Sequence, residues 1–252
     1  IMREYQATIL ENKPAAENIY SLTLALPEAV KIRAGQFADL SVGGAHLLKR
    51  PLAVCKADGE KVTVCYQIRG EGTKLLSERK AGETLDALLP LGNGFYLKEN
   101  EKKIALVGGG VGIFPMISVI GEYAAEKEIS AYIGFRNKGA VCGLEELKRA
   151  KKLTAVTDDG SFGEKMNAVQ AFAADLEAGE RPDVVLSCGP LPMLRALKTV
   201  LEGRDIPCYV SLEERMGCGI GACLVCVCEK TNGEHARVCK DGPVFGIGEV
   251  VL

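Results

Sequence analysis

The sequence predicts a multi-domain protein that combines an antiparallel β-barrel, an α/β domain with a parallel sheet, and a small cysteine-rich C-terminal segment. Short strand-like runs separated by glycine and proline fill residues 1–98, and strand and helix patterns alternate over residues 99–210. Four closely spaced cysteines lie within residues 211–252. A chain of 252 residues is long enough for two domains with separate cores and a small appendage.

The first part, residues 1–98, contains six short apolar or alternating runs. The predicted strands are residues 6–11, 19–26, 37–42, 51–56, 61–68 and 83–89. Six short strands joined by glycine and proline turns favour an antiparallel barrel. One helix is predicted at residues 73–79, after Gly70 and Gly72. A helix that begins after glycines is a natural phosphate site, because its free N–H groups and its dipole favour an anion.

Arg50, which directly precedes Pro51, is a second candidate for phosphate binding in the first part. Its guanidinium can bind a pyrophosphate through two parallel hydrogen bonds, and the proline keeps the backbone here extended. A surface charge at the start of a strand is the alternative interpretation. The GEGT sequence at residues 70–73 adds weight to phosphate binding, and both interpretations stay open.

The second part, residues 99–210, alternates between strand-like and helix-like runs. The predicted strands are residues 104–107, 129–135, 153–157, 184–188 and 208–212, and the predicted helices are residues 115–125, 144–149, 167–176 and 191–201. Such alternation predicts a parallel sheet with helices on both faces. Ligands of these sheets bind at the carboxyl ends of the strands.

Three of these strand ends carry residues that suit a dinucleotide. They are Gly108, Gly109, Gly110 and Gly112 after the first strand, Asp158 and Asp159 after the third, and Cys188, Gly189 and Pro190 after the fourth. Missing side chains let a pyrophosphate approach the backbone, and no Gly-Lys-Ser/Thr follows that would indicate a P-loop. Each motif alone is more often a turn than a site. Their equivalent positions in one sheet predict a nucleotide site.

Composition and charge exclude two function classes. The net charge is −2 and the charged residues are interspersed, which does not give the basic face that nucleic acid binding needs. Residues 104–121 carry no charge over eighteen positions, the lower limit for crossing a membrane. A short apolar run, a glycine-rich turn and an apolar helix explain this stretch as buried structure. We therefore expect neither a nucleic acid nor a membrane as partner.

The C-terminal segment contains the most specific motif of the chain. Residues 216–239 read MGCGIGACLVCVCEKTNGEHARVC. The candidate metal ligands are Cys218, Cys223, Cys226 and Cys239. Four residues separate the first two, two separate the next, and twelve precede the last, which is the plant-type spacing for a [2Fe-2S] cluster. Gly219 and Gly221 allow the loop to fold tightly over the cluster and bring backbone N–H groups close to sulfur.

Three alternatives compete with the cluster. A disulfide framework needs an oxidising compartment, and because no charged-then-apolar signal is seen at the start, ten cysteines predict a reducing cytoplasm. A structural zinc ion accepts four thiolates but usually uses two C-x-x-C pairs, and only one pair here has that spacing. Cys228 could replace Cys226 as a ligand, and we interpret Cys228 as a packing residue.

Taken together and in this order, the motifs at residues 50–54, 70–73, 108–112 and 188–190 resemble the ferredoxin-NADP reductase superfamily. The C-terminal [2Fe-2S] segment narrows the resemblance to the electron-transfer subunits of type B dihydroorotate dehydrogenase. The similarity covers essentially the full length and includes RVCKDGPVF at residues 237–245.

The resemblance implies a cofactor for each part. FAD is expected in the barrel, NAD(H) in the α/β domain and the cluster in the last segment. The expected FAD-binding residues are Arg50, Pro51, Leu52, Ala53, Gln67, Ile68, Arg69, Gly72 and Thr73. Ala53 departs from the family, which commonly has Ser or Thr there, with a hydroxyl that can bond flavin N5. Only the backbone could make that bond in this chain.

The resemblance also implies a function in pyrimidine biosynthesis. NADH and FAD exchange a hydride, the flavin exchanges single electrons with the cluster, and the cluster serves FMN in a partner subunit that interconverts dihydroorotate and orotate. The expected assembly is a heterotetramer of two subunits of each kind. Because the cofactors carry the chemistry, no general acid or base is expected in this chain.

Several alternatives stay open. The small subunit of a NAD(P)H-linked ferredoxin or sulfide oxidoreductase shares the same three parts, and Arg136 and Lys138 could read a 2′-phosphate and so favour NADP. A non-catalytic zinc-binding module is a second alternative. We interpret His46 and His235 as surface or packing residues. Residues 213–215 are interpreted as a solvated hinge, with a partner interface as the alternative.

Overall fold

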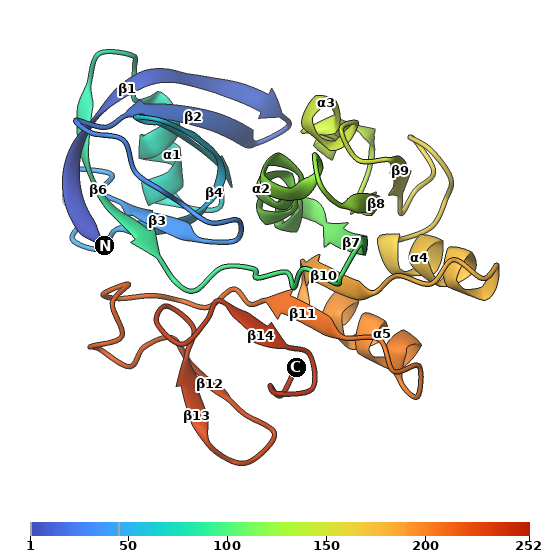
Figure 1. Cartoon of the computed structure of the whole chain (residues 1–252). Coiled ribbons are helices and arrows are strands. Elements are labelled where there is room, and N and C mark those ends of the chain that lie inside the picture. The colour runs from blue at the N-terminus through green and yellow to red at the C-terminus, as the bar shows by residue number, and fades with distance from the viewer. Residues whose placement is uncertain (1, 45) are drawn as a thin grey trace.

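The computed structural model describes residues 2–44 and 46–252, and its N-terminal part is a closed antiparallel barrel (Figure 1). The strands are β1 (Arg3–Ala16), β2 (Ile19–Ala25), β3 (Phe37–Leu40), β4 (Arg50–Asp58), β5 (Lys61–Gln67) and β6 (Thr84–Leu91), in the order β1-β2-β5-β4-β3-β6 around the barrel. Helix α1 (Glu71–Glu78) follows β5. The predicted barrel is thus confirmed, and closing it leaves no unpaired strand edge.

Strand β1 is longer than the predicted residues 6–11. It continues through a polar stretch to Ala16 because β2 pairs with it there, with Pro14 opposite Tyr20 and Ala16 opposite Ile19. Inside the barrel, alternate side chains of the strands form one apolar core with Leu76 of α1. Side chains of the opposite parity on β4 and β5, among them Ala53, face the α/β domain.

The second part is a parallel sheet with helices on both faces. Its strands are β7 (Lys103–Gly109), β8 (Glu128–Phe135), β9 (Lys152–Thr157), β10 (Val184–Cys188) and β11 (Cys208–Ser211). Its helices are α2 (Ile113–Tyr123), α3 (Leu144–Leu147), α4 (Ala168–Glu177) and α5 (Leu191–Leu201). The strand order is β11-β10-β7-β8-β9, so β7 and β10 are central neighbours and β9 lies at the edge. No helix of the described residues is both long and apolar enough to cross a membrane.

The C-terminal segment is joined to this sheet. A two-stranded ribbon, β12 (Val227–Glu229) with β13 (His235–Arg237), precedes β14 (Val244–Gly246). Strand β14 pairs antiparallel with β11 and becomes the sixth strand of the sheet. Five strands were predicted. The sixth is too short to be recognised from sequence and exists because β11 offers it a free edge.

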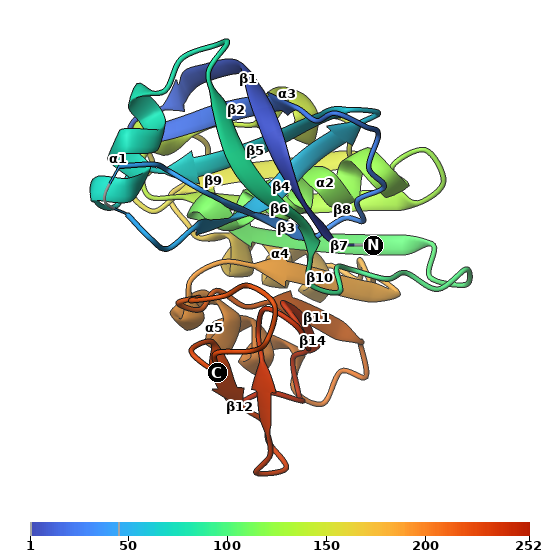
Figure 2. The same cartoon turned by 90° about the vertical axis from the view of Figure 1, so that its left-hand side faces the viewer.

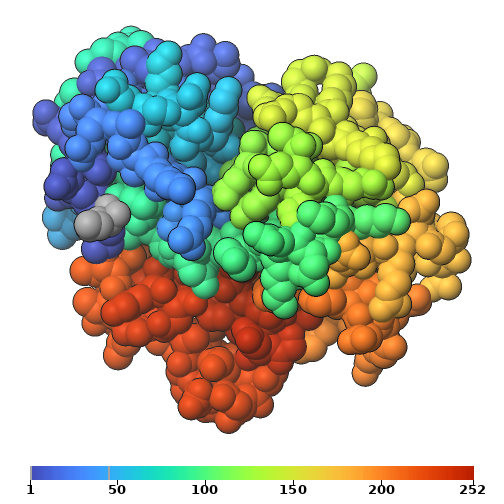
Figure 3. All heavy atoms as spheres, in the orientation of Figure 1, coloured from blue at the N-terminus to red at the C-terminus, as the bar shows by residue number. Residues whose placement is uncertain are grey.

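The segment also contacts the barrel, as the two cartoon views and the space-filling view show (Figures 1, 2 and 3). Asn93, just after β6, donates hydrogen bonds to the carbonyls of Asp241 (3.1 Å) and Val244 (3.0 Å) and accepts one from the Val244 N–H at 3.2 Å. Cys226 and Cys239 belong to the same apolar cluster as Phe37 of the barrel. The three parts therefore meet at one place.

Candidate functional site

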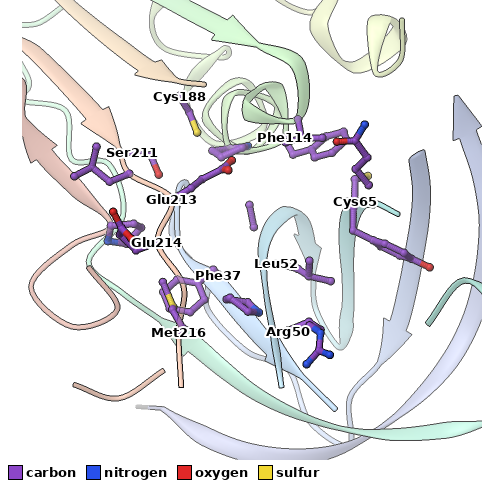
Figure 4. Close-up of a pocket in the computed structure, with 18 of the residues that line it drawn as sticks. Phe37, Arg50, Leu52, Cys65, Phe114, Cys188, Ser211, Glu213, Glu214 and Met216 are labelled. Atoms are coloured by element: carbon purple, nitrogen blue, oxygen red, sulfur yellow. The ribbon is translucent and has the colours of Figure 1, made fainter. Parts of the chain in front are cut away.

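Two neighbouring pockets lie between the barrel and the parallel sheet. The central pocket, of about 270 Å³, is lined by β3, β4 and β5, by the start of α2 and by the chain after β11 (Figure 4). The side pocket, of about 370 Å³, is lined by the β1–β2 turn and by the chain after β7, β8 and β10. The residues that line both pockets are Gln67, Arg69, Val111 and Glu213.

Most of the residues predicted to bind FAD or NAD(H) lie at these pockets. The central pocket is lined by Arg50, Pro51, Leu52, Ala53, Gln67, Arg69, Thr73 and Cys188. The side pocket is lined by Gln67, Arg69, Gly109, Gly110, Gly189 and Pro190. The remaining members of the predicted set, all of them described, line neither pocket: Ile68, Gly72, Gly108, Gly112, Asp158 and Asp159.

Gly72 contributes to the site indirectly, because its missing side chain leaves room for the guanidinium of Arg50. A Cβ at Gly72 would lie 2.2 Å from Nη2 of Arg50, so the guanidinium rests directly on the first turn of α1. Thr73 Oγ1 accepts hydrogen bonds from the N–H groups of Arg69 (2.9 Å) and Gly70 (3.2 Å) and thereby fixes the turn before the helix. A guanidinium and a helix N-terminus that share one spot suit a pyrophosphate.

Replacing Gly72 with alanine should displace Arg50 and weaken FAD binding by roughly tenfold or more, because the pyrophosphate loses a charged hydrogen-bond donor. The fold should persist, since the side chain that must move is flexible and alanine favours a helix. Flavin retained per chain after dialysis, together with the circular dichroism spectrum, measures both effects. Gly70→Ala is the matched control, because nothing lies within 4 Å of its added Cβ. Equal flavin loss in both variants would contradict this assignment.

The glycines at the end of β7 and directly after it allow neighbouring protein atoms, as well as a ligand, to approach the backbone. A Cβ at Gly112 would lie 2.2 Å from the carbonyl oxygen of Cys188, and one at Gly109 would lie 2.6 Å from Sδ of Met193. Gly110, with φ +55°, has nothing within 4 Å and lines the side pocket. Close packing of the loops after β7 and β10 therefore forms the floor of the side pocket, and Gly110 is the point where a ligand can approach the backbone.

Asp158 and Asp159 lie in a turn after the edge strand β9. The Asp158 N–H donates to the carbonyl of Phe135 at 3.0 Å. Asp159 Oδ1 accepts hydrogen bonds from the N–H (2.9 Å) and the hydroxyl (2.6 Å) of Ser161, which hold the pKa of Asp159 below its usual value. Their carboxylates are two strands away from β7, so a role in binding the nucleotide stays a prediction.

The four candidate ligands of the C-terminal segment lie as two pairs of thiols. The thiol of Cys218 contacts that of Cys223, and the thiol of Cys226 contacts that of Cys239. Among the described residues, no three His, Cys, Asp or Glu side chains converge as ligands of a single ion would. Two pairs suit a two-iron cluster, in which each iron takes two thiolates.

We call Cys218 and Cys223 the outer pair, and Cys226 and Cys239 the inner pair. The loop around the outer pair stabilises ionised sulfur. Cys218 Sγ accepts hydrogen bonds from the N–H groups of Ala222 (3.3 Å) and Cys223 (3.4 Å). Burial opposes ionisation, but backbone N–H groups outweigh it and lower the pKa of Cys218 to about 6. In the inner pair, Cys226 Sγ accepts from the Cys239 N–H at 3.4 Å. N–H···S bonds of this kind stabilise thiolates that bind a cluster.

Cys228 differs from these four cysteines. It lies in β12 opposite Ala236, is half-buried and packs against the apolar cluster shared with α5. Burial raises the pKa of its thiol. This environment agrees with the interpretation of Cys228 as a packing residue. All ten cysteines are free, which argues against a disulfide framework.

Known families match the last two parts of the chain. Residues 213–251 match the iron-sulfur cluster binding domain of dihydroorotate dehydrogenase B, and residues 106–199 match the oxidoreductase NAD-binding domain. The dihydroorotate dehydrogenase B (NAD(+)) electron transfer subunit of Geobacillus sp. (strain WCH70) is 41% identical over 264 residues, with 100% of both chains covered. The chain belongs to the family of dihydroorotate dehydrogenase B electron transfer subunits.

Another relative and two solved structures agree. The same subunit of Caldanaerobacter subterraneus subsp. tengcongensis is 39% identical over 98% of each chain. The structure of an NADH-dependent reduced ferredoxin-NADP oxidoreductase aligns over 97% of this chain and 89% of its own, with a TM-score of 0.85 and 24% identity. The cytochrome b5 reductase domain of Ulva prolifera nitrate reductase aligns over 82% of this chain and 97% of its own, with a TM-score of 0.66 and 15% identity. These two structures support the fold.

Membership of this family confirms the resemblance seen in the motifs. The predicted cofactor classes, an iron–sulfur cluster, FAD and NAD(H), agree with the matched domains and with the fold. The match to an iron-sulfur domain also favours the cluster over zinc. The individual binding residues stay predictions that the pocket geometry supports.

Three of the pocket residues that the sequence motifs do not mark bear on the chemistry of the site. Met216 lines the central pocket only two positions before Cys218. The loop that carries the first three candidate ligands, residues 216–226 and called the cluster loop below, therefore forms part of that pocket's wall. Ser211 and Glu213 line it as well, because β11 ends at its mouth. A solvated hinge is what we expect from the sequence of residues 213–215, with a partner interface as the alternative. A strand end of the parallel sheet was the available signal, since β11 ends beside β10.

Asp39 is a buried carboxylate between the barrel and the cluster loop. Its side chain is 2% exposed, and Oδ1 has no hydrogen-bond partner among the described residues. A Cβ at Gly219 would lie 3.0 Å from Asp39 Oδ2, so the cluster loop covers this carboxylate. Burial raises the pKa of Asp39 to about 6, and the charges of Lys49 and Arg50 offset only part of the effect.

Asp39→Asn should stabilise the protein at pH 8 by about 1–3 kcal/mol, because an ionised carboxylate no longer has to be buried. The folded-state pKa is raised, so the acid stabilises the fold at low pH and this stabilisation is lost as the pH rises through about 6. The gain should therefore shrink towards pH 5. Thermal midpoints between pH 5 and 8 test this, with Asp86→Asn on the exposed side of β6 as control. A gain that does not vary with pH would contradict the titration of Asp39.

Proposed function

We propose that this chain is the electron-transfer subunit of an NAD-dependent dihydroorotate dehydrogenase. The central pocket binds FAD, the side pocket binds NAD(H), and the four cysteines of the two thiol pairs bind a [2Fe-2S] cluster. Residues 1–98, 99–210 and 211–252 are the corresponding units. The observation that carries the proposal is the meeting of all three sites, because Met216 of the cluster loop lines the central pocket and Glu213, three residues before it, lines both pockets.

The residues of the chain bind and orient the cofactors. When bound, FAD exchanges electron pairs with NAD(H) and single electrons with the cluster. Arg50 and the first turn of α1 bind the FAD pyrophosphate, and the extended backbone of β4 lies along the flavin. Ala53 offers the flavin no hydroxyl. Phe37, Cys226 and Cys239 are all buried in one larger apolar cluster, which keeps water away from the inner thiol pair.

The partner in this proposal is an FMN-bearing catalytic subunit that interconverts dihydroorotate and orotate. The outer thiol pair is the accessible side of the cluster, because Cys223 is exposed while Cys226 and Cys239 are buried. Around it, Ile220 (42%), Leu224 (61%) and Val225 (55%) expose apolar side chains. An apolar patch over a redox centre suits a protein partner. A cytoplasmic heterotetramer of two subunits of each kind completes the proposal.

Anaerobic purification followed by assays of flavin, iron and acid-labile sulfide tests the cofactors. NADH should reduce both flavin and cluster, and the chain alone should reduce artificial acceptors but not oxidise dihydroorotate. Adding the FMN-bearing subunit should couple the oxidation of dihydroorotate to the reduction of NAD+. Stoichiometric zinc without flavin, or a cluster that stays oxidised while NADH bleaches the flavin with the partner present, would contradict the proposal. Electron transfer to ferredoxin without any oxidation of dihydroorotate would favour the alternative, the small subunit of a NAD(P)H-linked ferredoxin or sulfide oxidoreductase.

A further inference from the structure

A carboxylate lies where the central and side pockets meet. Of the four residues that line both pockets, only Arg69 and Glu213 carry a charge. Hydride transfer requires the nicotinamide ring and the flavin to lie in contact. If the proposed function holds, the reacting rings therefore meet beside these two side chains.

The neighbours of Glu213 place it at the ring end of the nucleotide. Glu213 lies two residues after the end of β11 and reaches into the cavity on the same side as Cys188 and Ser211 (Figure 4). Burial, and then the nearby charge of Glu213, raise the pKa of the Cys188 thiol. Gly189 and Pro190, which follow that cysteine, line the side pocket. Glu213 thus faces the wall that β10 contributes to the nucleotide site.

Arg69 has a different role. Its guanidinium complements phosphate, and its Nε donates to Oε1 of Gln67 at 3.0 Å. A carboxylate repels phosphate, so Glu213 suits the uncharged or cationic end of the nucleotide. The nicotinamide ring is a cation in NAD+ and neutral in NADH. A negative charge beside it in a partly water-excluded pocket stabilises the oxidised form.

We propose that Glu213 makes the nucleotide site select the oxidised nicotinamide over the reduced one. The carboxylate acts by its charge, without taking or giving a proton, and this agrees with a chain that needs no general acid or base. By stabilising the cationic ring it makes bound NAD+ harder to reduce and favours hydride release from NADH. Glu213 is a specificity residue of the proposed reaction.

The test measures the dissociation constants of the flavin- and cluster-loaded protein for NAD+ and for NADH. The protein is kept oxidised for the NAD+ titration and reduced for the NADH titration, so that no turnover occurs. In Glu213→Gln, which keeps the shape and removes the charge, the NAD+ constant should rise about tenfold and the NADH constant should change less than about twofold. A tenfold change shifts the potential of the bound two-electron couple by about 30 mV. Glu213→Asp should keep most of the preference.

Glu202→Gln is the control, because Glu202 is exposed at the end of α5 and lines neither the central nor the side pocket. Its ratio of the two constants should equal that of the wild type. Equal weakening of both nucleotides in Glu213→Gln, or no weakening of either, would overturn the inference. Failure of the wild type to bind either nucleotide would overturn the proposed function itself.

Discussion

Replacing Cys226 with serine should remove the iron–sulfur cluster and stop electron transfer beyond the flavin. Cys226 is 2% exposed, and its sulfur accepts the N–H of Cys239, so no solvent ligand can take its place. Serine is also a poor ligand for iron, because its hydroxyl is seldom ionised. The charge-transfer absorbance of the cluster should disappear. NADH oxidation by a two-electron dye should stay within about twofold of the wild type, because Cys226 itself lines neither the central nor the side pocket.

Cys228→Ser is the control for this experiment. It lies two positions further along the chain and is only half-buried, so the variant should keep the cluster spectrum and its electron transfer. Loss of the cluster in Cys228→Ser with retention in Cys226→Ser would reverse our choice of ligand. Iron and sulfide content per chain, measured together with the spectrum, separates loss of the cluster from loss of the fold.

Replacing Gly112 with alanine should destabilise the protein by about 3 kcal/mol or more and impair nucleotide binding. The added Cβ would lie 2.2 Å from the carbonyl oxygen and 2.5 Å from the carbonyl carbon of Cys188, and 2.7 Å from the nitrogen of Gly189. All three are backbone atoms of a central strand end and cannot move as a flexible side chain could. The loop that lines the side pocket must therefore shift.

Thermal unfolding and titration with NADH measure the two effects. Gly121→Ala is the matched control, since Gly121 lies on the exposed side of α2 with nothing within 4 Å of an added Cβ. Alanine there should stabilise the helix by up to about 1 kcal/mol and leave binding unchanged. Similar loss of stability in both variants would contradict the close packing of the loops after β7 and β10.

The sequence by itself determined the order and type of the elements of the barrel and of the first five strands and the helices of the α/β domain, and it indicated a cluster in the last segment. Its barrel strands and the helices of the second part lie close to their predicted positions, because their apolar periodicity is local. Three of the four predicted ligands, Cys218, Cys223 and Cys226, lie within nine residues of one another, so their spacing alone agrees with the geometry that a two-iron cluster requires. Glycines before α1 and after β7 likewise lie next to the turns they permit.

Only the tertiary structure decided how these parts meet. Pairing of β14 with β11, the contacts of Asn93 with the C-terminal segment, and the burial of Asp39 join positions far apart in sequence. The order of strands in the sheet places Asp158 at an edge and Cys188 at the centre. The order of the strands along the chain does not reveal this difference. Glu213 is the clearest example of a position that is set by contacts between parts of the chain that are far apart in sequence. Its sequence neighbours, Leu212 and Glu214, form no motif of a binding site, and its position between two pockets arises only because β11 ends where the barrel, the sheet and the cluster loop come together.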